Sequence, residues 1–311
     1  MDTYVSISIY LPRNAPRKQC EKDLEQIWQE MSALDSLFSN YRDDNEISAI
    51  NKNARKREVA ITQRTLEMLK TAQRVSEITN GAFDVTVGSL TKTWGFGRDP
   101  TVPTQKEIDA DLESVGFRFL QLDTIDSTIK FSKRETRIDV GGIAKGAIID
   151  AAYHSLQARG YRDFLIDAGG DLRMAASGLT SGKRNIWVVH PRRPGEFLAR
   201  FPLDNGAVAT TGDYERFFVE NGKRFHHIID PSTGYPSSRA VSATVVAPNA
   251  TMADAFATAF FILGPKSGIA LAEKLPDIEA MIVFEDNQEL HPRFTQYLAN
   301  KVEILNNTSD K

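Results

Sequence analysis

The stretch RIDVGGIAKG (residues 137–146) says most about the fold. Its first four residues, Arg137 to Val140, predict a strand, a glycine pair follows, and the residues from Ala144 to Ala158 predict a helix. A glycine turn that opens a helix exposes backbone N–H groups, and the helix end adds partial positive charge, so phosphate or pyrophosphate suits it as a ligand. Lys145 adds a full charge. The spacing matches neither the Walker A motif nor the dinucleotide fingerprint, so a purely structural turn stays open.

The chain before this stretch predicts a strand followed by two helices. Apolar and polar residues alternate from Tyr4 to Leu11, the period-two pattern of a half-buried strand, and Pro12 ends it. The later helix is predicted from Thr65 to Thr79 and stops at Asn80-Gly81. The earlier one is long and amphipathic, with apolar positions three and four residues apart after Pro16: Cys20, Leu24, Ile27, Trp28, Met31, Leu34 and Phe38.

After residue 146 the chain mixes strand and helix patterns. They do not alternate strictly as strand, helix and strand, which favours an α+β fold over a doubly wound parallel sheet. No linker or shift in composition divides the sequence, so we expect one domain with two lobes. The predicted strands cover residues 164–168, 185–190, 225–229, 241–247 and 278–284, and a further helix covers 252–263.

Composition narrows the class of protein. The 311 residues are 41% hydrophobic and 25% charged, which is ordinary for a globular protein with a large core. A formal net charge of -3 gives no electrostatic footprint for nucleic acid. Because no uninterrupted apolar run reaches the roughly 18 residues of a membrane helix, we expect no transmembrane segment. A single cysteine, Cys20, cannot form an internal disulfide and is expected on the apolar face of its helix.

Asp254 and Thr258 lie four residues apart on the predicted helix at 252–263 and therefore project from the same face. A carboxylate and a hydroxyl, with a backbone carbonyl, are hard oxygen ligands suited to Mg²⁺. The alternative is that Asp254 starts the helix and Thr258 packs. The rest of this helix is strongly apolar, so a carboxylate there requires a partner.

Two histidines, His226 and His227, end a predicted strand just before a tight turn. One imidazole could act as a general base or bind phosphate. Since neighbouring strand residues face opposite sides, we expect at most one of them in a given site. A structural histidine is the alternative for either, and Asp230 is expected to organise the turn through its side chain.

Two more glycine motifs allow a ligand to approach the backbone. One is Asp167-Ala168-Gly169-Gly170-Asp171 at the end of a predicted strand. The other is Asn80-Gly81-Ala82-Phe83-Asp84, which with Trp94-Gly95-Phe96-Gly97 supplies aromatic planes and a carboxylate for a flat heterocycle. Plain turns and core aromatics are the alternatives.

Read together, these segments resemble the ApbE-like flavin transferases, the FAD:protein FMN transferases, from Met1 to about Gly264. The resemblance implies a T-fold-like, two-lobed single domain over residues 1–311. The motifs occur in order along the chain: Ser39-Asn40-Tyr41, Gly81 to Asp84, Asp139 to Gly146, Asp167 to Asp171, His227 to Gly234, and Ala253 to Thr258.

The resemblance implies a site that holds FAD and Mg²⁺. The ion would bridge the FAD pyrophosphate to the chain through Asp254, Thr258 and a carbonyl near Gly142. His227 is the candidate general base. The implied FAD contacts are Met1, Tyr41, Ala82, Phe83, Asp84, Asp139, Lys145 and Ile228.

The implied reaction moves FMN from FAD, the substrate, onto a threonine hydroxyl of an acceptor flavoprotein, a redox or respiratory protein, and releases AMP. The nucleophile then belongs to the partner, and the chain supplies positioning and charge neutralisation. Two alternatives need the same ligand site: a carrier that holds FAD without turnover, and a Mg²⁺-dependent FAD pyrophosphatase that gives FMN and AMP.

The sequence departs from the family pattern at its start, where Met1-Asp2-Thr3 replaces the usual Met-Gly-Thr. Asp2 near a flavin edge would alter the first FAD contact. Family members are often exported lipoproteins. The expected location is the periplasmic face of the inner membrane if a leader was trimmed, and the cytoplasm if the chain is complete.

Overall fold

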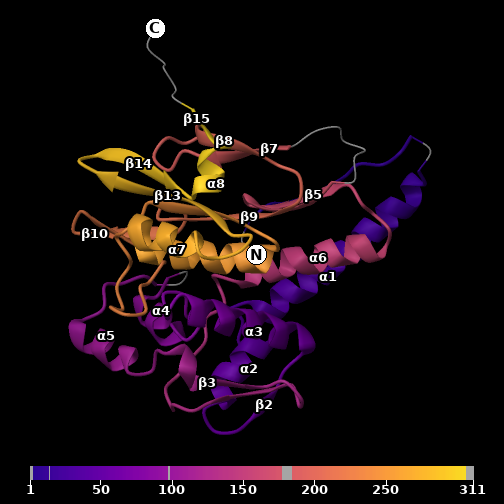
Figure 1. Cartoon of the computed structure of the whole chain (residues 1–311). Helices are drawn as coiled ribbons and strands as arrows, with labels where there is room; N and C mark the ends of the chain where they lie inside the picture. Colours follow the sequence, from indigo (N-terminus) through magenta and orange to yellow (C-terminus); the bar gives the residue numbers. More distant parts are fainter. Residues whose placement is uncertain (1–2, 14, 97–98, 177–183, 306–311) are drawn as a thin grey trace.

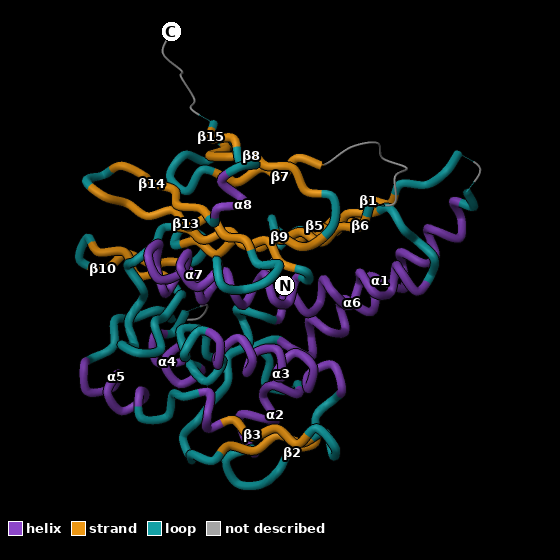
Figure 2. The backbone as a smooth tube through the Cα atoms, viewed as in Figure 1, coloured by secondary structure: helices purple, strands orange, loops and turns teal. Residues whose placement is uncertain are grey.

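The centre of the fold is a seven-stranded sheet in which all neighbouring strands are antiparallel. The computed structural model, shown in Figures 1 and 2, describes residues 3–13, 15–96, 99–176 and 184–305. The strand order is β1-β5-β6-β9-β12-β13-β14, so the N-terminal strand forms one edge. The strands are β1 (Val5–Ile9), β5 (Phe164–Ala168), β6 (Asp171–Ala175), β9 (Gly206–Gly212), β12 (Ser242–Ala247), β13 (Glu279–Asp286) and β14 (Glu289–Phe294).

Helices cover one face of this sheet. Figure 2 shows α6 (Ala144–Ala158) and α7 (Ala250–Ala272) beneath the strands, with α1 (Arg17–Phe38) against α6. The apolar positions of α1 recur at helical spacing, and Ile27 and Met31 are buried in the main core. Cys20 is buried on the same helix, as predicted from its register.

A small sheet covers the opposite face. It has the order β15-β8-β7 and is accompanied by the short helix α8. A second core fills the space between the two sheets, with Met281 from the large sheet and Phe201 from the small one among its buried members. The elements are β7 (Arg184–Val189), β8 (Phe197–Leu203), α8 (Gln296–Ala299) and β15 (Glu303–Ile304).

The remaining elements form a mostly helical part below α6 and α7 in Figure 1. It contacts α7 through α3. Its elements are α2 (Glu46–Asn53), α3 (Gln63–Ile78), α4 (Gly88–Trp94), α5 (Gln105–Leu112), the 3-10 turn η1 (Phe117–Phe119), and a sheet of β2 (Val59–Ala60), β4 (Thr128–Phe131) and β3 (Leu120–Asp123). A hairpin of β10 (Phe217–Glu220) and β11 (Lys223–His226) lies next to α7. The predicted α+β class is confirmed; the T-fold-like description stays a prediction.

By length and composition, α7 is apolar enough to cross a membrane. In this fold it packs between the sheet and the helical part, and 56% of its most apolar window is buried inside the structure. The helix is also interrupted, because Gly264 has a φ of 73° and Pro265 follows. The apolar sequence of α7 is therefore explained by its packing between the sheet and the helical part.

Several predicted elements agree with the structure, and others need correction. The helix at 144–158 and the strand at 164–168 have the predicted bounds. The strand predicted from Arg137 to Val140 is wrong, since only an isolated bridge joins Arg137 to Val87. There the N–H of Ile138 donates to the Asn51 side chain at 2.7 Å, in place of a second strand. The strand predicted to reach Ile229 ends at His226, and the helix predicted at 252–263 extends over Ala250–Ala272.

Candidate functional site

The N-terminus of α6 lies directly against α7. A Cβ atom on Gly146 would come within 2.2 Å of the Ala250 carbonyl oxygen, so only glycine permits this approach. At that crossing the Gly146 N–H donates to Asp254 Oδ2 at 3.0 Å. The carboxylate that an apolar helix would otherwise leave without a partner therefore faces the start of α6.

The three predicted metal ligands come together at this crossing. A Cβ on Gly142 would lie 3.0 Å from Thr258 Oγ1 and 3.3 Å from the ring of Phe83, so Gly142 faces both residues closely. Asp254 is one turn before Thr258 on the same face of α7. Thr211 at the end of β9 adds a hydroxyl 3.4 Å from Thr258 Oγ1. Asp254 is a side-chain partner of α6 rather than the cap of α7, since Asn249 caps α7.

Lys145 is the positive charge of the site. Its Nζ lies 2.9 Å from Oδ2 of the buried Asp171. Burial by itself would lower the pKa of Lys145, but the carboxylates of Asp171, Asp254 and Glu215 raise it above its ordinary value. Lys145 is therefore a permanent cation at the glycine turn.

The carboxylates outnumber the lysine. Burial raises the pKa of Asp254 to about 7, and Asp171 adds to that rise, while Lys145 and the Gly146 N–H oppose it. Glu215 also acts on Asp254 and on Lys145. Burial likewise raises the pKa of Asp171 and of Glu215, so the site holds its carboxyl groups partly against ionisation, and a divalent cation bound beside them would favour their charged forms.

The donor set also fits Mg²⁺, which takes few protein oxygens and completes its shell with water and substrate phosphate. In the described part of the chain, no group of three or more His, Cys, Asp or Glu side chains is placed to hold a metal ion. A cation at Asp254, Thr258 and the Gly142 carbonyl would therefore depend on oxygens from the substrate. The residues present fit a shared site of this kind, and they do not fit a metal cage built by the protein alone.

Asp139 organises the turn that precedes α6. Its Oδ1 accepts from the Asn40 side chain at 2.6 Å and from the Gly141 N–H at 2.8 Å, and its Oδ2 accepts from Thr91 Oγ1 at 2.8 Å. These bonds hold residues 139–142 in place. The partners Asn40 and Thr91 come from the end of α1 and from α4, far apart in the sequence.

The two histidines have different environments. The ring of His226 is buried against Phe261, its Nε2 donates to the Ser237 carbonyl at 2.7 Å, and its Nδ1 accepts from the Ile228 N–H at 3.2 Å. Both nitrogens are therefore used inside the fold. The expectation that at most one histidine enters a site agrees with this arrangement, and His226 is structural.

His227 is the first residue after β11 and has a different partner. Its Nδ1 lies 3.2 Å from the Arg216 carbonyl oxygen, and because a carbonyl only accepts, Nδ1 carries the proton. The other nitrogen, Nε2, is then a lone-pair acceptor. Burial lowers the pKa of His227 to about 4, although the bond to Arg216 acts in the opposite direction, so the ring is neutral near pH 7.

Arg216 joins His227 to Tyr41. While its carbonyl holds His227, its Nη1 donates to the Tyr41 hydroxyl at 3.0 Å. Tyr41 is 47% exposed, so its ring is open to a planar ligand. Ile228, the next residue after His227, is buried in the main core.

The predicted FAD contacts at residues 82–84 are partly occupied by the fold. Both oxygens of Asp84 accept hydrogen bonds from the chain, Oδ1 from Thr86 and Oδ2 from the Phe117 N–H at 2.6 Å. Ala82 is half-buried against the main core, and Phe83 is buried beside Gly142. Phe83 thus lies at the metal-ligand cluster, whereas Asp84 orders the turn into η1.

Met1 lies outside the described residues. Thr3 is described, and its side chain occupies the position that a Cβ on Gly169 would take. The N-terminal segment therefore runs along the β5–β6 turn, whose last residue is Asp171. Gly169 and Gly170 have φ values of 64° and 92°, which favour glycine and explain the pair.

Sequence reasoning gave no role to several residues of the site. Asn40 and Asp171 belong to motifs that the sequence shows, but neither had an assigned function. For Asp171, the two glycines just before it were the signal that a ligand can approach there. Thr211, Glu215 and Arg216 gave no signal, because they come from the end of β9 and the segment after it.

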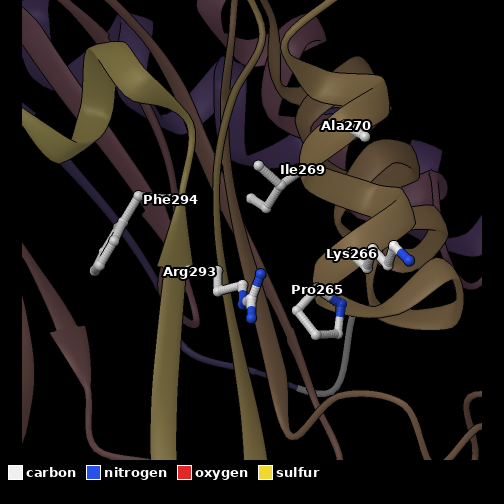
Figure 3. Close-up of a pocket in the computed structure, with 6 residues that line it drawn as sticks. All are labelled: Pro265, Lys266, Ile269, Ala270, Arg293 and Phe294. Carbon is white, nitrogen blue, oxygen red and sulfur yellow. The ribbon is translucent and has the colours of Figure 1, made fainter.

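Two hollows in the surface lie outside the cluster of Lys145, Asp254 and Thr258. One, of about 450 Å³, lies between the end of α7 and β14; Figure 3 shows Arg293 close to Pro265 and the ring of Phe294 turned away. The other, of about 810 Å³, runs beside β11. Neither is lined by Lys145, Asp254 or Thr258. The charges and hydrogen bonds at the α6–α7 crossing make that crossing the candidate site.

Comparisons with known proteins show what this chain is similar to. The model of the ApbE family matches residues 1–282. The FAD:protein FMN transferase of Vibrio cholerae is 31% identical over 92% of this chain and 85% of its own length. That of Haemophilus influenzae is 32% identical over 89% and 83%. The crystal structure of the ApbE protein of Thermotoga maritima superimposes with a TM-score of 0.85 at 31% identity, covering 96% of both chains.

Proposed function

Because the chain belongs to the ApbE family, we propose that it is a flavin transferase that moves FMN from FAD to a partner protein. Two relatives named FAD:protein FMN transferase are 31% and 32% identical to it over 92% and 89% of the chain. The observation that carries the proposal is the cluster at the α6–α7 crossing. There Gly142 and Lys145 of one motif meet Asp254 and Thr258 of another, more than a hundred residues further along the chain. We propose further that residues 1–311 act as a single domain.

The start of α6 and Lys145 bind the FAD pyrophosphate in this proposal. Backbone N–H groups at a helix N-terminus favour an anion, and Lys145 supplies a full positive charge. Tyr41, Phe83, Ala82 and Ile228 lie around the nucleotide, while Asp139 holds the glycine turn in the required shape. Met1 and Asp84 are retained as proposed contacts, with Asp84 acting through the turn that it orders.

Asp254, Thr258 and the Gly142 carbonyl would hold Mg²⁺ together with the substrate. Bound there, the ion would act as a Lewis acid on the pyrophosphate and as a template for it. Gly146 orients Asp254 through its N–H, and Thr211 orients the Thr258 hydroxyl. These contacts keep the ligand oxygens in place before the substrate arrives.

His227 acts as the general base. Its protonated Nδ1 is fixed by the Arg216 carbonyl, so Nε2 can accept the proton of the attacking hydroxyl. We propose that the hydroxyl belongs to a threonine in a redox or respiratory flavoprotein. Its oxygen bonds to the phosphorus on the FMN side, the bond between the two phosphates breaks, and AMP leaves with the bridging oxygen.

The test is incubation of the protein with FAD, Mg²⁺ and a threonine-containing acceptor domain, with and without a chelator. An FMN-sized gain in acceptor mass with equal AMP release, abolished by chelation, is expected. Asp254→Asn should lose the Mg²⁺-dependent rate while its unfolding midpoint stays near that of the parent. Free FMN without an adduct would identify a pyrophosphatase, and intact bound FAD would identify a carrier; either result contradicts the transferase.

A further inference from the structure

The free edge of β11 has unused backbone hydrogen-bonding groups. The N–H of His227 donates to the Arg216 carbonyl at 3.1 Å, which shows which residues of the hairpin pair through their backbones. In an antiparallel ladder every second residue bonds to the partner strand, here the odd-numbered ones. The even-numbered residues, Arg224 and His226, therefore direct their N–H and C=O groups away from β10. Within the described ranges, these outward backbone groups have no hydrogen-bond partner. β11 is thus an open strand edge.

The same edge is closed two residues further along, at Ile228. Asp230 N donates to the Tyr235 carbonyl at 2.8 Å, and Ser237 N donates to the Ile228 carbonyl at 3.0 Å. Beyond Ser237, residues 238–241 and β11 both line the groove of about 810 Å³. This volume is in the range of ligand pockets. Because one wall of the groove is an unpaired strand edge, the groove suits a peptide segment in extended conformation.

The lining of the groove carries an excess of positive charge. It has four cations, Arg192, Lys223, Arg224 and Arg239, and three carboxylates. The carboxylates are already paired: Asp213 with Arg192 at 2.6 Å, Glu285 with Arg192 at 3.4 Å, and Asp230 with Arg239 at 2.8 Å.

The other two cations contact aromatic rings instead. Among the described residues, neither Lys223 nor Arg224 forms an ion pair; Lys223 lies over Phe225 and Arg224 over Phe217. Both side chains are exposed. They are available to carboxylates of a bound partner, which would be attracted by the local field.

We propose that an extended, acidic segment of the acceptor protein binds in this groove and adds a strand to the β11 edge. The inference rests on the proposed transfer function. The open edge ends at His226, and the next residue, about 3.8 Å along the chain, is His227. A segment paired with Arg224 and His226 therefore ends one residue from the base, and the part of the acceptor that follows it must leave the groove toward Arg216, beside the His227 ring, to present its hydroxyl. Backbone pairing supplies affinity, and Lys223 and Arg224 supply the preference for acidic side chains.

The experiment selects binders from a displayed library of random octapeptides with a fixed central threonine, using the full chain saturated with FAD and Mg²⁺. Two variants test the groove. Ser238→Trp fills it from an exposed position, with Ser32→Trp on α1 as the control. Arg224→Glu reverses its charge, with Arg118→Glu as the control, because Arg118 is also an exposed cation over an aromatic ring.

We expect the parent to enrich Asp and Glu beside the threonine at least fivefold. Both groove variants should bind the selected peptides at least tenfold more weakly than the parent. Both control variants should bind the peptides within twofold of the parent, and the affinity for FAD should stay within twofold in all of them. No binders, binders without acidic enrichment, or binders retained by Ser238→Trp would overturn the proposal. If the parent chain dimerises and the Ser238→Trp substitution abolishes the dimer, the proposal is also overturned, because the groove then holds a second copy of the chain.

Binding of the selected peptides and transfer of FMN are measured separately. Selected peptides that bind in the groove without receiving FMN would contradict the proposed function and leave the docking groove in place. Transfer of FMN to an acceptor with an unchanged KM in Arg224→Glu would support the function and contradict the groove.

Discussion

Neighbouring histidines have different roles in this protein. His226 uses both ring nitrogens within the fold, whereas His227 uses only Nδ1 and keeps Nε2 as an acceptor. The difference comes from their tertiary partners: His226, the last residue of β11, is bonded to Ser237 and Ile228, and His227, just after the strand, is bonded to Arg216. Residue type by itself did not separate them.

Replacing His227 tests its role as a base. His227→Asn should keep a donor to the Arg216 carbonyl but remove the proton acceptor, so the transfer rate should fall by roughly 10²- to 10⁴-fold. The Kd for FAD should change by less than about threefold, since a base acts mainly in the transition state. Single-turnover kinetics and FAD titration measure the two quantities. An equal loss in both would make His227 a binding contact.

The pH dependence of stability reports on the same ring. Folding lowers the pKa of His227 from 6.5 to about 4, so between these pH values the unfolded chain binds more protons than the folded one. The stability contributed by the neutral ring is complete above pH 6.5 and is lost as the pH falls toward 4. Urea midpoints at pH 7 and pH 5 should therefore differ more in the parent than in His227→Asn.

His226 is the internal control for this measurement. Burial also lowers its pKa, so part of the acid sensitivity should persist in His227→Asn. If the urea midpoints of the parent and of His227→Asn change by the same amount between pH 7 and pH 5, burial does not lower the pKa of His227 in the folded protein.

At the scale of elements, the crossing of α6 and α7 builds the site. Asp150 of α6 accepts from the N–H groups of Ala250 and Thr251 and from the Thr251 hydroxyl, and so ties down the start of α7. It also lies 3.4 Å from Arg173 Nε of β6. One buried carboxylate thus fixes the angle between two helices and a strand, which in turn positions Asp254.

Asp150→Ala should be strongly destabilising. It removes three hydrogen bonds at a helix N-terminus and leaves the buried Arg173 without its carboxylate, at a cost of about 3–5 kcal/mol. Urea unfolding measures the change, with the exposed Asp126→Ala as the control, expected within about 0.5 kcal/mol of the parent. A loss below about 1 kcal/mol for Asp150→Ala would show that the crossing is held by packing alone.

At the scale of the whole molecule, α7 couples the sheet to the helical part. It contacts β9, β12 and β13 on one side and α3 on the other, and its fully buried residues belong to a core shared by both parts. Parts that share one core are expected to unfold together. For this reason we propose that residues 1–311 act as one domain.

Hydrogen exchange along a urea gradient tests that unity. Amides of β9 in the sheet and α3 in the helical part should lose protection at the same urea concentration, within about 0.3 M, because neither part keeps its core without α7. The two-stranded hairpin β10–β11, which lies outside the large sheet, serves as the comparison, with protection lost earlier. Two separated transitions for β9 and α3 would mean two independently stable domains.

Sequence periodicity predicted the elements whose pattern is local. The long helix α1, the strand β5 and the helix α6 follow from apolar spacing, and the order of motifs identified the family before any coordinates. These features depend on interactions between residues close in the chain, or on residue types at fixed spacing, both of which a single sequence contains.

Contacts between distant segments could not be predicted in this way. The extended stretch at Arg137 to Val140 has the composition of a strand, but tertiary contacts with Asn51 and Asn40 replace strand pairing. The sequence by itself determined the residue types of the site, its glycine turn and the α+β class. Only the tertiary structure decided which carboxylates surround Lys145, which histidine keeps a free nitrogen and where a strand edge stays open, because burial and pairing depend on segments more than a hundred residues apart in some cases.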